Sequence, residues 1–195
     1  MTWIYLVRHG ETDWNRDGRL QGILDVRLNE VGIHQGRQIA QRFSSLRALK
    51  VYTSPLWRAL HTATLLQSHV RDCPVIIEPR LREIDHGVWT GLTMGRITRD
   101  FPEEFEGWQL RPDRVRPRGG ESLQEPYSRA AGFLHELTET STGSDVLIVS
   151  HGVINALLVC AATGAPLARL WNFPQPNAHV TALRVEGQKV VGIKR

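Results

Sequence analysis

Hydrophobic and polar positions along this chain follow two alternating patterns. Short, mostly apolar runs such as 4–7 and 146–149 are typical of buried strands. Longer segments carry apolar residues at helical spacing, and the run 153–162 is apolar nearly all round, which indicates a buried helix. The pattern predicts strands at 4–7, 51–53, 74–79, 146–149, 179–185 and 190–193, and helices at about 30–46, 55–68, 94–101, 119–140 and 153–162, with one or two helical turns at 166–171.

This order of elements predicts an α/β fold. Strands that alternate with helices form a mostly parallel sheet with helices on both faces, and the final two strands form a hairpin that adds one antiparallel strand. The length of 195 residues fits a single domain, 1–195. The pattern changes over 92–120, where the basic stretch 111–118 is punctuated by proline and glycine and is too irregular for a helix or a strand.

Composition narrows the class of protein. A hydrophobic share of 41% and a charged share of 23% are those of an ordinary globular protein. No apolar run approaches the roughly 20 residues that span a bilayer, so we expect no membrane partner. The first residues lack the pattern of a signal peptide, so we expect a cytoplasmic location. The net charge of +4 comes from dispersed arginines without a recognition motif, so we expect no nucleic-acid partner.

The two cysteines give at most one disulfide and no metal-ligand spacing. Cys160 lies in the apolar helix and is expected to be a small core residue. Cys73 stands beside Pro74 at the entrance of a strand and is expected to be a semi-exposed thiol. Neither residue is a candidate nucleophile.

Candidate chemistry lies where predicted strands end. The first strand stops at Arg8 and His9, and a later one delivers His151, so both histidines are expected at the carboxyl edge of one sheet, where ligands bind in open α/β folds. Arg58 follows another strand, in the first turn of a helix whose exposed N–H groups also favour an anion. Guanidinium groups beside an imidazole suit a phosphate that must be held and attacked.

Four motifs occur in order in these strand and helix contexts: Leu6-Val7-Arg8-His9-Gly10-Glu11-Thr12, Ser54-Pro55-Leu56-Trp57-Arg58, Glu83 ahead of a Gly-x-Trp-x-Gly turn, and Ser150-His151-Gly152. The set resembles the histidine phosphatase superfamily, the phosphoglycerate mutase-like proteins, over about residues 4–183. The resemblance implies a three-layer α/β/α sandwich, in agreement with the pattern. It also implies that 92–120 is a lid that sets substrate preference, although a solvated basic loop explains the arginine-rich stretch equally well.

The resemblance also carries functional roles onto matching positions. His9 is expected to attack phosphorus in line and form a phosphohistidine, which water then hydrolyses. Glu83 is expected to protonate the leaving alkoxide, and His151 to stabilise charge on the phosphoryl oxygens. Asp85 is a weaker candidate for the acid, and His86 is expected to face substrate or solvent. Phosphate binding is assigned to Arg8, Arg58, Asn15, Gln21 and Gly152.

Elementary electrostatics supports these roles. Nearby arginines lower the pKa of His9, which keeps its imidazole neutral and nucleophilic, and a backbone carbonyl is expected to hold the other ring nitrogen. Burial and neighbouring phosphate raise the pKa of the Glu83 carboxyl, so that it can carry a proton near neutral pH. Because arginines and histidines neutralise the phosphate, we expect neither a metal ion nor another cofactor.

Two other functions compete with hydrolysis of a small phosphate monoester. A cofactor-dependent phosphoglycerate mutase uses the same residues, but such mutases typically carry a larger insertion, and the short one here is similar to that of the broad-specificity and α-ribazole phosphatase branch. A non-catalytic binding protein for phosphate or nucleic acid is the second alternative, although degenerate family members lose the first His or the acid, and this chain retains both. The physiological substrate stays open, as does the choice between monomer and homodimer.

Overall fold

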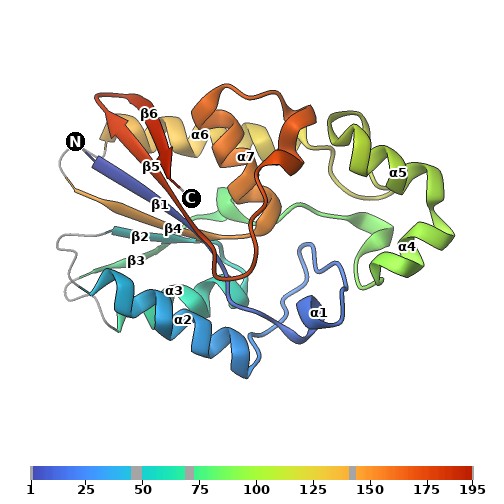
Figure 1. The fold of residues 1–195 in the computed structure, drawn as a ribbon, viewed down its shortest axis with the longest axis horizontal. Coiled ribbons are helices and arrows are strands. Elements are labelled where there is room, and N and C mark those ends of the chain that lie inside the picture. Colours follow the sequence, from blue (N-terminus) through green and yellow to red (C-terminus); the bar gives the residue numbers. More distant parts are fainter. Residues whose placement is uncertain (1, 45–49, 69–72, 141–143, 195) are drawn as a thin grey trace.

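The computed structural model describes residues 2–44, 50–68, 73–140 and 144–194, and within these ranges the strands form one six-stranded sheet (Figure 1). The sheet has the order β3-β2-β4-β1-β5-β6. Strands β1 to β4 run parallel, β5 is antiparallel to β1, and β6 is antiparallel to β5. The predicted mostly parallel sheet with one antiparallel strand is therefore confirmed. The strands are β1 (Thr2–Arg8), β2 (Lys50–Thr53), β3 (Val75–Ile77), β4 (Val146–Ser150), β5 (Val180–Glu186) and β6 (Lys189–Lys194).

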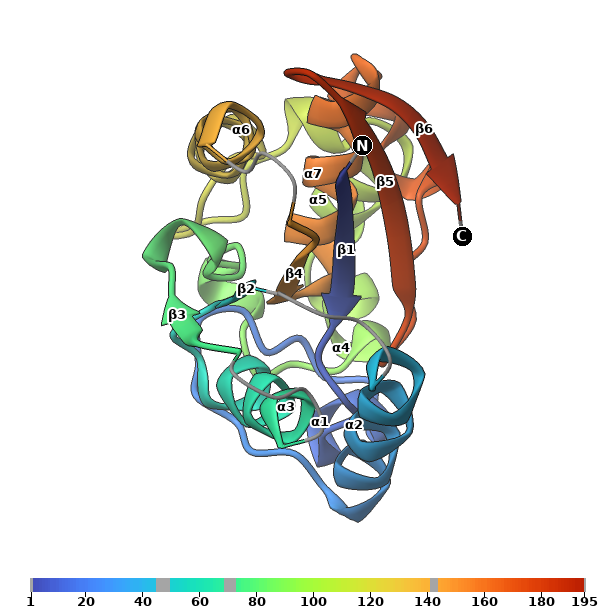
Figure 2. The same ribbon diagram turned by 90° about the vertical axis from the view of Figure 1, so that its left-hand side faces the viewer.

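Helices cover both faces of the sheet, as Figure 2 shows from a second side. Helices α2 and α3 lie on one face and α6 and α7 on the other, while α4 and α5 extend beyond the sheet (Figure 1). The α-helices are α1 (Asp13–Arg16), α2 (Glu30–Phe43), α3 (Trp57–Gln67), α4 (Met94–Asp100), α5 (Pro102–Leu110), α6 (Gln124–Thr140) and α7 (Gly152–Thr163). Short 3-10 turns are η1 (Pro79–Leu81), η2 (Gly87–Trp89), η3 (Pro112–Arg114) and η4 (Leu167–Asn172). None of the helices in the described ranges is long and apolar enough to cross a membrane.

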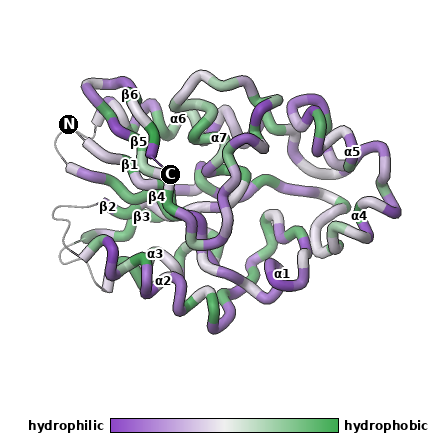
Figure 3. Tube along the Cα trace, viewed as in Figure 1, coloured by the Kyte–Doolittle hydropathy of each residue, from purple (hydrophilic) through white to green (hydrophobic). Residues whose placement is uncertain are grey.

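Alternate residues of the central strands point to opposite faces, which divides the core in two. In β4, Val146 and Ile148 pack with the side chains of α6 and α7, whereas Leu147 and Val149 pack with those of α2 and α3. Since both faces are covered, β4 reads as a continuous apolar run instead of an alternating one. Figure 3 shows the hydrophobic positions gathered along this strand and α7 in the interior.

Several predicted helix boundaries have a clear local cause. Asn29 caps α2, because its side chain accepts a hydrogen bond from the Gly32 N–H at 2.8 Å. The predicted end of this helix at Leu46 lies outside the described residues. Gly164 ends α7 in the left-handed conformation, with φ 70°, which glycine adopts without a steric cost. The helix predicted from 119 begins only at Gln124, because Gly119 and Gly120 take part in a turn packed against 85–87.

One expectation was wrong, and one helix was not predicted. Cys73 is 3% exposed instead of semi-exposed, because it packs into the core between the sheet and α3, and this burial raises the pKa of its thiol. Helix α5 was not predicted, although Pro102 in its first turn, followed by two glutamates, is a typical helix start.

Candidate active site

The parallel register of the central strands brings the two predicted histidines together. Arg8, the last residue of β1, pairs with Ser150, the last residue of β4, and the His9 N–H donates to the Ser150 carbonyl at 3.0 Å. His9 and His151 therefore leave neighbouring strands at the same edge, and their ring centroids lie 5.2 Å apart. Both imidazoles are buried.

His9 is held in one orientation by its own neighbour. Its Nδ1 lies 2.7 Å from the Gly10 carbonyl oxygen, so this nitrogen carries the proton and donates, and Nε2 keeps its lone pair. A side chain at position 10 would collide with the Gly32 carbonyl, so glycine is required for this close approach to α2. Burial, followed by the charges of Arg58 and Arg8, lowers the pKa of His9 well below its usual value. The expected carbonyl partner of the ring is thus present, and the pKa shift has the expected direction, which favours the neutral imidazole. Burial contributes more to this shift than the arginines do.

Both arginines are fixed by backbone carbonyls. Arg58 is 1% exposed and donates from Nη1 to Leu24 O and from Nη2 to Gly22 O, each at 2.7 Å. Arg8 donates from Nη1 to Gln175 O at 2.6 Å. Burial lowers the pKa of both guanidiniums, that of Arg58 to about 10, and both Nε atoms are buried without a partner among the described residues. Two desolvated cations with unused donors favour a bound anion.

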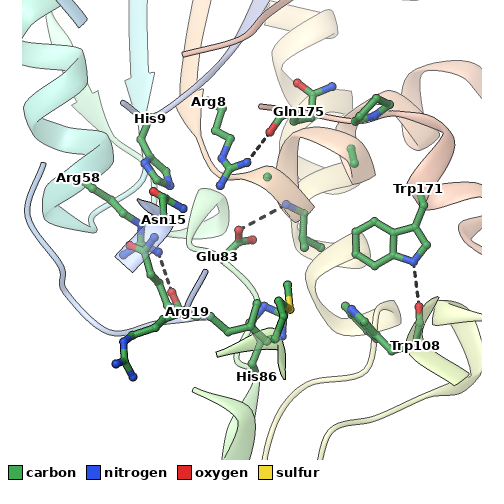
Figure 4. Close-up of a pocket in the computed structure, with 18 of the residues that line it drawn as sticks. Arg8, His9, Asn15, Arg19, Arg58, Glu83, His86, Trp108, Trp171 and Gln175 are labelled. Atoms are coloured by element: carbon green, nitrogen blue, oxygen red, sulfur yellow. Dashed lines mark hydrogen bonds between the residues drawn. The ribbon is translucent and has the colours of Figure 1, made fainter. Parts of the chain in front are cut away.

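Glu83 faces this pair from the other side of the cavity (Figure 4). It is buried, and its carboxyl oxygens accept from the N–H of Ile84 at 3.1 Å and of Val153 at 3.4 Å. Burial raises its pKa above the ordinary value, and the arginines only partly oppose this. Arg129 of α6 donates to the carbonyls of Arg82 at 2.7 Å and Glu83 at 3.3 Å, which fixes the backbone that carries this acid.

His151 lies behind His9 and is oriented by Ser54. Its Nε2 is 2.7 Å from the Ser54 hydroxyl oxygen, which also accepts from the Leu56 N–H at 3.2 Å. Because this hydroxyl is fully buried, its own hydrogen is satisfied by donation to Nε2, which leaves the proton of a neutral ring on Nδ1. Burial and the nearby Arg58 lower the pKa of His151 well below its usual value.

The remaining predicted phosphate ligands also line the cavity. Asn15 stands in α1, which Thr12 caps, and its side-chain oxygen accepts from the Thr12 N–H at 3.2 Å. Gln21 is 7% exposed, and its side-chain oxygen is buried without a partner in the described part of the chain. Gly152 is the first residue of α7 and lies against the Arg8 guanidinium.

The cavity has a volume of about 270 Å³ and continues past the charged groups to an apolar wall (Figure 4). The Trp171 indole N–H donates to the Trp108 carbonyl at 2.9 Å, which fastens α5 of the predicted lid to η4. His86 lines the cavity, with its pKa lowered to about 4 by burial, whereas Asp85 does not and instead accepts from the Gly87 N–H. The apolar lining residues are Leu20, Met94, Trp108, Val153, Ala156, Trp171, Phe173 and Pro174.

A neutral ring nitrogen beside one buried and one half-buried guanidinium suits the transfer of a phosphoryl group, so the fold and the site together define an enzyme of phosphate esters. Comparison with known proteins gives the family. Residues 4–193 match the model of the histidine phosphatase superfamily (branch 1), and the chain belongs to that superfamily. Its resemblance to the family over nearly its whole length is thereby confirmed.

Relatives with phosphatase names support hydrolysis as the activity. The chain is 37% identical to phosphoserine phosphatase 1 of Hydrogenobacter thermophilus over 194 residues, which are 100% of this chain and 92% of the relative. It is also 39% identical to the probable phosphoglycerate mutase GpmB of Cronobacter sakazakii over 170 residues, 85% of this chain and 77% of that one.

Solved structures extend this result. A mycobacterial glucosyl-3-phosphoglycerate phosphatase has a TM-score of 0.87 and 31% identity, with 94% of this chain and 93% of that one covered. An α-ribazole phosphatase from Shigella flexneri has a TM-score of 0.86 and 29% identity, with coverages of 96% and 93%. The chain is a phosphatase, and the mutase alternative is the less favoured one.

Residues outside the predicted set also contribute to the site. Ser54 was quoted only as part of a motif, and the contacts of Gln175 and Asn177 with the first strand were not foreseen. One signal pointed to the latter two: a final strand antiparallel to β1 must begin at the edge where β1 ends.

Proposed function

We propose that this chain hydrolyses phosphate monoesters through a phosphohistidine on His9. The observation that carries the proposal is the unprotonated Nε2 of His9 in one cavity with the buried Arg58, the half-buried Arg8 and a carboxyl of raised pKa. The dianionic phosphate satisfies the unused donors of Arg8 and Arg58, with further contacts from Asn15 and Gln21. Gly152 contributes through the start of α7.

Transfer then proceeds in two balanced steps. The lone pair of His9 Nε2 forms a bond to phosphorus while the P–O bond to the alcohol breaks, and the alkoxide oxygen takes the proton of Glu83. In the second step the Glu83 carboxylate takes a proton from water, whose oxygen bonds to phosphorus as the N–P bond breaks. Inorganic phosphate leaves, and both side chains return to their starting states. Neutral His151 donates a hydrogen bond from its Nδ1–H to the phosphoryl oxygens and adds no charge to the site.

The part of the cavity beyond the phosphate indicates what kind of alcohol leaves. Of the described residues that line it, Glu83 is the only acidic one, so the ammonium group of an amino-acid substrate has no carboxylate partner other than the proposed acid. Trp108, Trp171 and Phe173 instead offer aromatic surface. We therefore propose monoesters of aromatic or largely apolar alcohols as better substrates than phosphoserine.

The test compares wild type with His9→Ala in EDTA, on p-nitrophenyl phosphate, phenyl phosphate, phosphoserine and a sugar phosphate. We expect phosphate release that the variant lacks, higher kcat/KM for the aryl esters, and a ³²P label on wild type that survives alkali and is lost in acid, as a phosphohistidine does. Equal activity of His9→Ala and wild type would refute the proposal.

Mutase activity is the second candidate, because several relatives carry the name probable phosphoglycerate mutase. Transfer to phosphoglycerate that depends on 2,3-bisphosphoglycerate and exceeds hydrolysis would favour it. The cytoplasmic location, the single domain and the choice between monomer and homodimer stay predictions.

A further inference from the structure

Residues 173–179, here called loop 173–179, contact the site from the far end of the sequence. Because β5 is antiparallel to β1, Val180 pairs with Val7 and the loop arrives at the edge where β1 ends. Three of its main-chain groups meet the first motif: the His179 carbonyl accepts from the Arg8 N–H at 3.0 Å, and the other two belong to Gln175 and Ala178. Gln175 O accepts from Arg8 Nη1, and the Ala178 N–H donates to His9 O at 3.2 Å.

One side chain in the loop, that of Asn177, contacts three parts of the site at once. Its Nδ2 lies 3.2 Å from the carbonyl oxygen of His9, 3.1 Å from the side-chain oxygen of Asn15 and 3.4 Å from the carbonyl oxygen of Gly10. The Gly10 carbonyl is also the acceptor that orients the His9 ring. A single carboxamide thus bridges the backbone of the proposed nucleophile and a proposed phosphate ligand.

These contacts settle which way the Asn15 amide faces. Its oxygen is met by three donors: Asn177 Nδ2, the Thr12 N–H at 3.2 Å and the Thr12 hydroxyl at 3.0 Å. A flipped amide would set its NH₂ group against those donors, so the oxygen must stay where it is. The NH₂ group is then left over, and within the described residues it donates to no protein acceptor. Since Asn15 lines the cavity, this group is available to a phosphate.

The backbone next to Asn177 supports the same conclusion independently. Ala178 has φ 59°, in the left-handed region that a residue with a Cβ occupies at a cost of about 1 to 2 kcal/mol. Such a conformation persists where surrounding contacts hold it, and here the N–H of this residue is bonded to His9 O. The loop is therefore built to meet His9 at this point.

We propose that Asn177 is a positioning residue, which fixes the Asn15 amide so that its NH₂ group faces the phosphate and braces the His9–Gly10 backbone. The inference rests on the proposed function of this site. Asn177 does not touch the reacting atoms itself and acts through Asn15 and the backbone of His9.

The test uses Asn177→Ala, with Asn172→Ala as the matched control. Asn172 is exposed at the end of η4, and its side chain makes no hydrogen bond within the described residues. We expect Asn177→Ala to lower kcat/KM for p-nitrophenyl phosphate about 10- to 100-fold, because small displacements of reacting groups are costly. The control is expected to stay within about twofold, the precision of such rates.

A double-mutant cycle separates positioning from general damage. In an Asn15→Ala background, the Asn177 substitution is expected to cost clearly less than in wild type, because one of the two groups that it acts through is gone and only the His9–Gly10 backbone contacts remain. The inference is overturned if the fold-loss of kcat/KM in the double variant equals the product of the fold-losses in the two single variants. It is also overturned if a folded Asn177→Ala variant is as active as wild type. Asn177→Asp, which keeps the shape and loses the NH₂ donor, replaces the alanine variant if that one does not fold.

Orthovanadate binding, measured by calorimetry, keeps this result distinct from the proposed function. If wild type binds orthovanadate but hydrolyses no ester, the proposed function fails. The positioning inference is then decided by binding alone: it stands if Asn177→Ala weakens binding at least fivefold through the same coupling to Asn15, and it fails if binding is unchanged.

Discussion

Glu83 is the residue whose replacement best separates chemistry from folding. Glu83→Gln keeps the size of this buried side chain and removes its titratable proton. The amide oxygen can still accept from the Ile84 N–H, whereas the NH₂ group displaces the acceptor of the longer bond to Val153. That loss costs about 1 kcal/mol, and relief from burying a carboxyl opposes it. We therefore expect the free energy of unfolding to change by no more than about 1 kcal/mol.

The effect on turnover is expected to be much larger. A general acid contributes about 10²- to 10⁴-fold, or about 3 to 5 kcal/mol of activation free energy. This loss applies to both steps for an alkyl phosphate, whose alkoxide must be protonated. The p-nitrophenolate ion leaves without a proton, so only the attack of water on the phosphohistidine is slowed for p-nitrophenyl phosphate.

Rapid mixing distinguishes the two steps. With p-nitrophenyl phosphate, Glu83→Gln is expected to release a burst of p-nitrophenol equivalent to the enzyme, followed by a slow steady state, while glycerol phosphate gives no burst. A steady-state rate equal to that of wild type would refute the role of Glu83 as acid and base. So would an equal loss on both substrates with no burst.

The pH dependence of wild type follows from the same two groups. His9 must be neutral, and its lowered pKa means that kcat/KM falls only when the pH drops well below 6.5. Glu83 must be protonated in the first step, so kcat/KM for an alkyl phosphate falls as the pH rises through its raised pKa. In the Glu83→Gln variant, kcat/KM for an alkyl phosphate is expected to fall at low pH as in wild type but no longer to fall as the pH rises.

Three further predictions concern neighbours of the site. Ser54→Ala leaves the Leu56 N–H and His151 Nε2 without their partner. We therefore expect the free energy of unfolding, measured by urea titration, to fall by about 1 to 3 kcal/mol and kcat to fall about tenfold. Ser44→Ala, at an exposed position, is expected to change neither. Trp171→Ala removes aromatic surface from the apolar wall and is expected to raise KM for phenyl phosphate about three- to tenfold with little effect on phosphoserine; equal effects on both would contradict the proposed alcohol preference. His86 has a pKa of about 4 in the folded protein, so at pH 5 its imidazole is protonated mainly in the unfolded chain, which lowers the free energy of unfolding by about 2 kcal/mol relative to pH 7. The His86→Gln variant is expected to lose about 2 kcal/mol less stability than wild type between pH 7 and pH 5, as measured by thermal unfolding at both pH values.

The sequence was sufficient where chemistry and strand ends coincide. An apolar run that stops at Arg8-His9, and another that stops before His151, predict a shared edge because parallel strands of one sheet end on the same side. The direction of the pKa shift for His9 also followed from the residue types alone, although its larger cause, burial, became visible only in the folded structure.

What sequence could not provide depends on contacts between backbone and distant side chains. The carbonyls of Gly22 and Leu24 that hold Arg58 carry no residue-specific signal, and neither does the carbonyl of Gln175 that holds Arg8. Asn177 reads as an ordinary turn residue, because its partners lie more than 160 positions away. Cys73 was misjudged because its place beside a proline at the entrance of a strand suggested partial exposure, while the side chain itself packs inward.

The in-register pairing of β1 with β4 has a consequence for how such an enzyme can change. Neighbouring strands are separated by about 4.8 Å. The ring centroids of the two imidazoles lie 5.2 Å apart, close to that spacing, because each ring follows directly on one of the two paired strands. Loop insertions therefore cannot retune the distance between them. Part of the surface proposed to meet the alcohol, from Met94, Trp108 and Trp171, belongs to α4, α5 and η4, outside the sheet. Selection can exchange these segments for new substrates while a spacing dictated by peptide hydrogen bonds preserves the reaction.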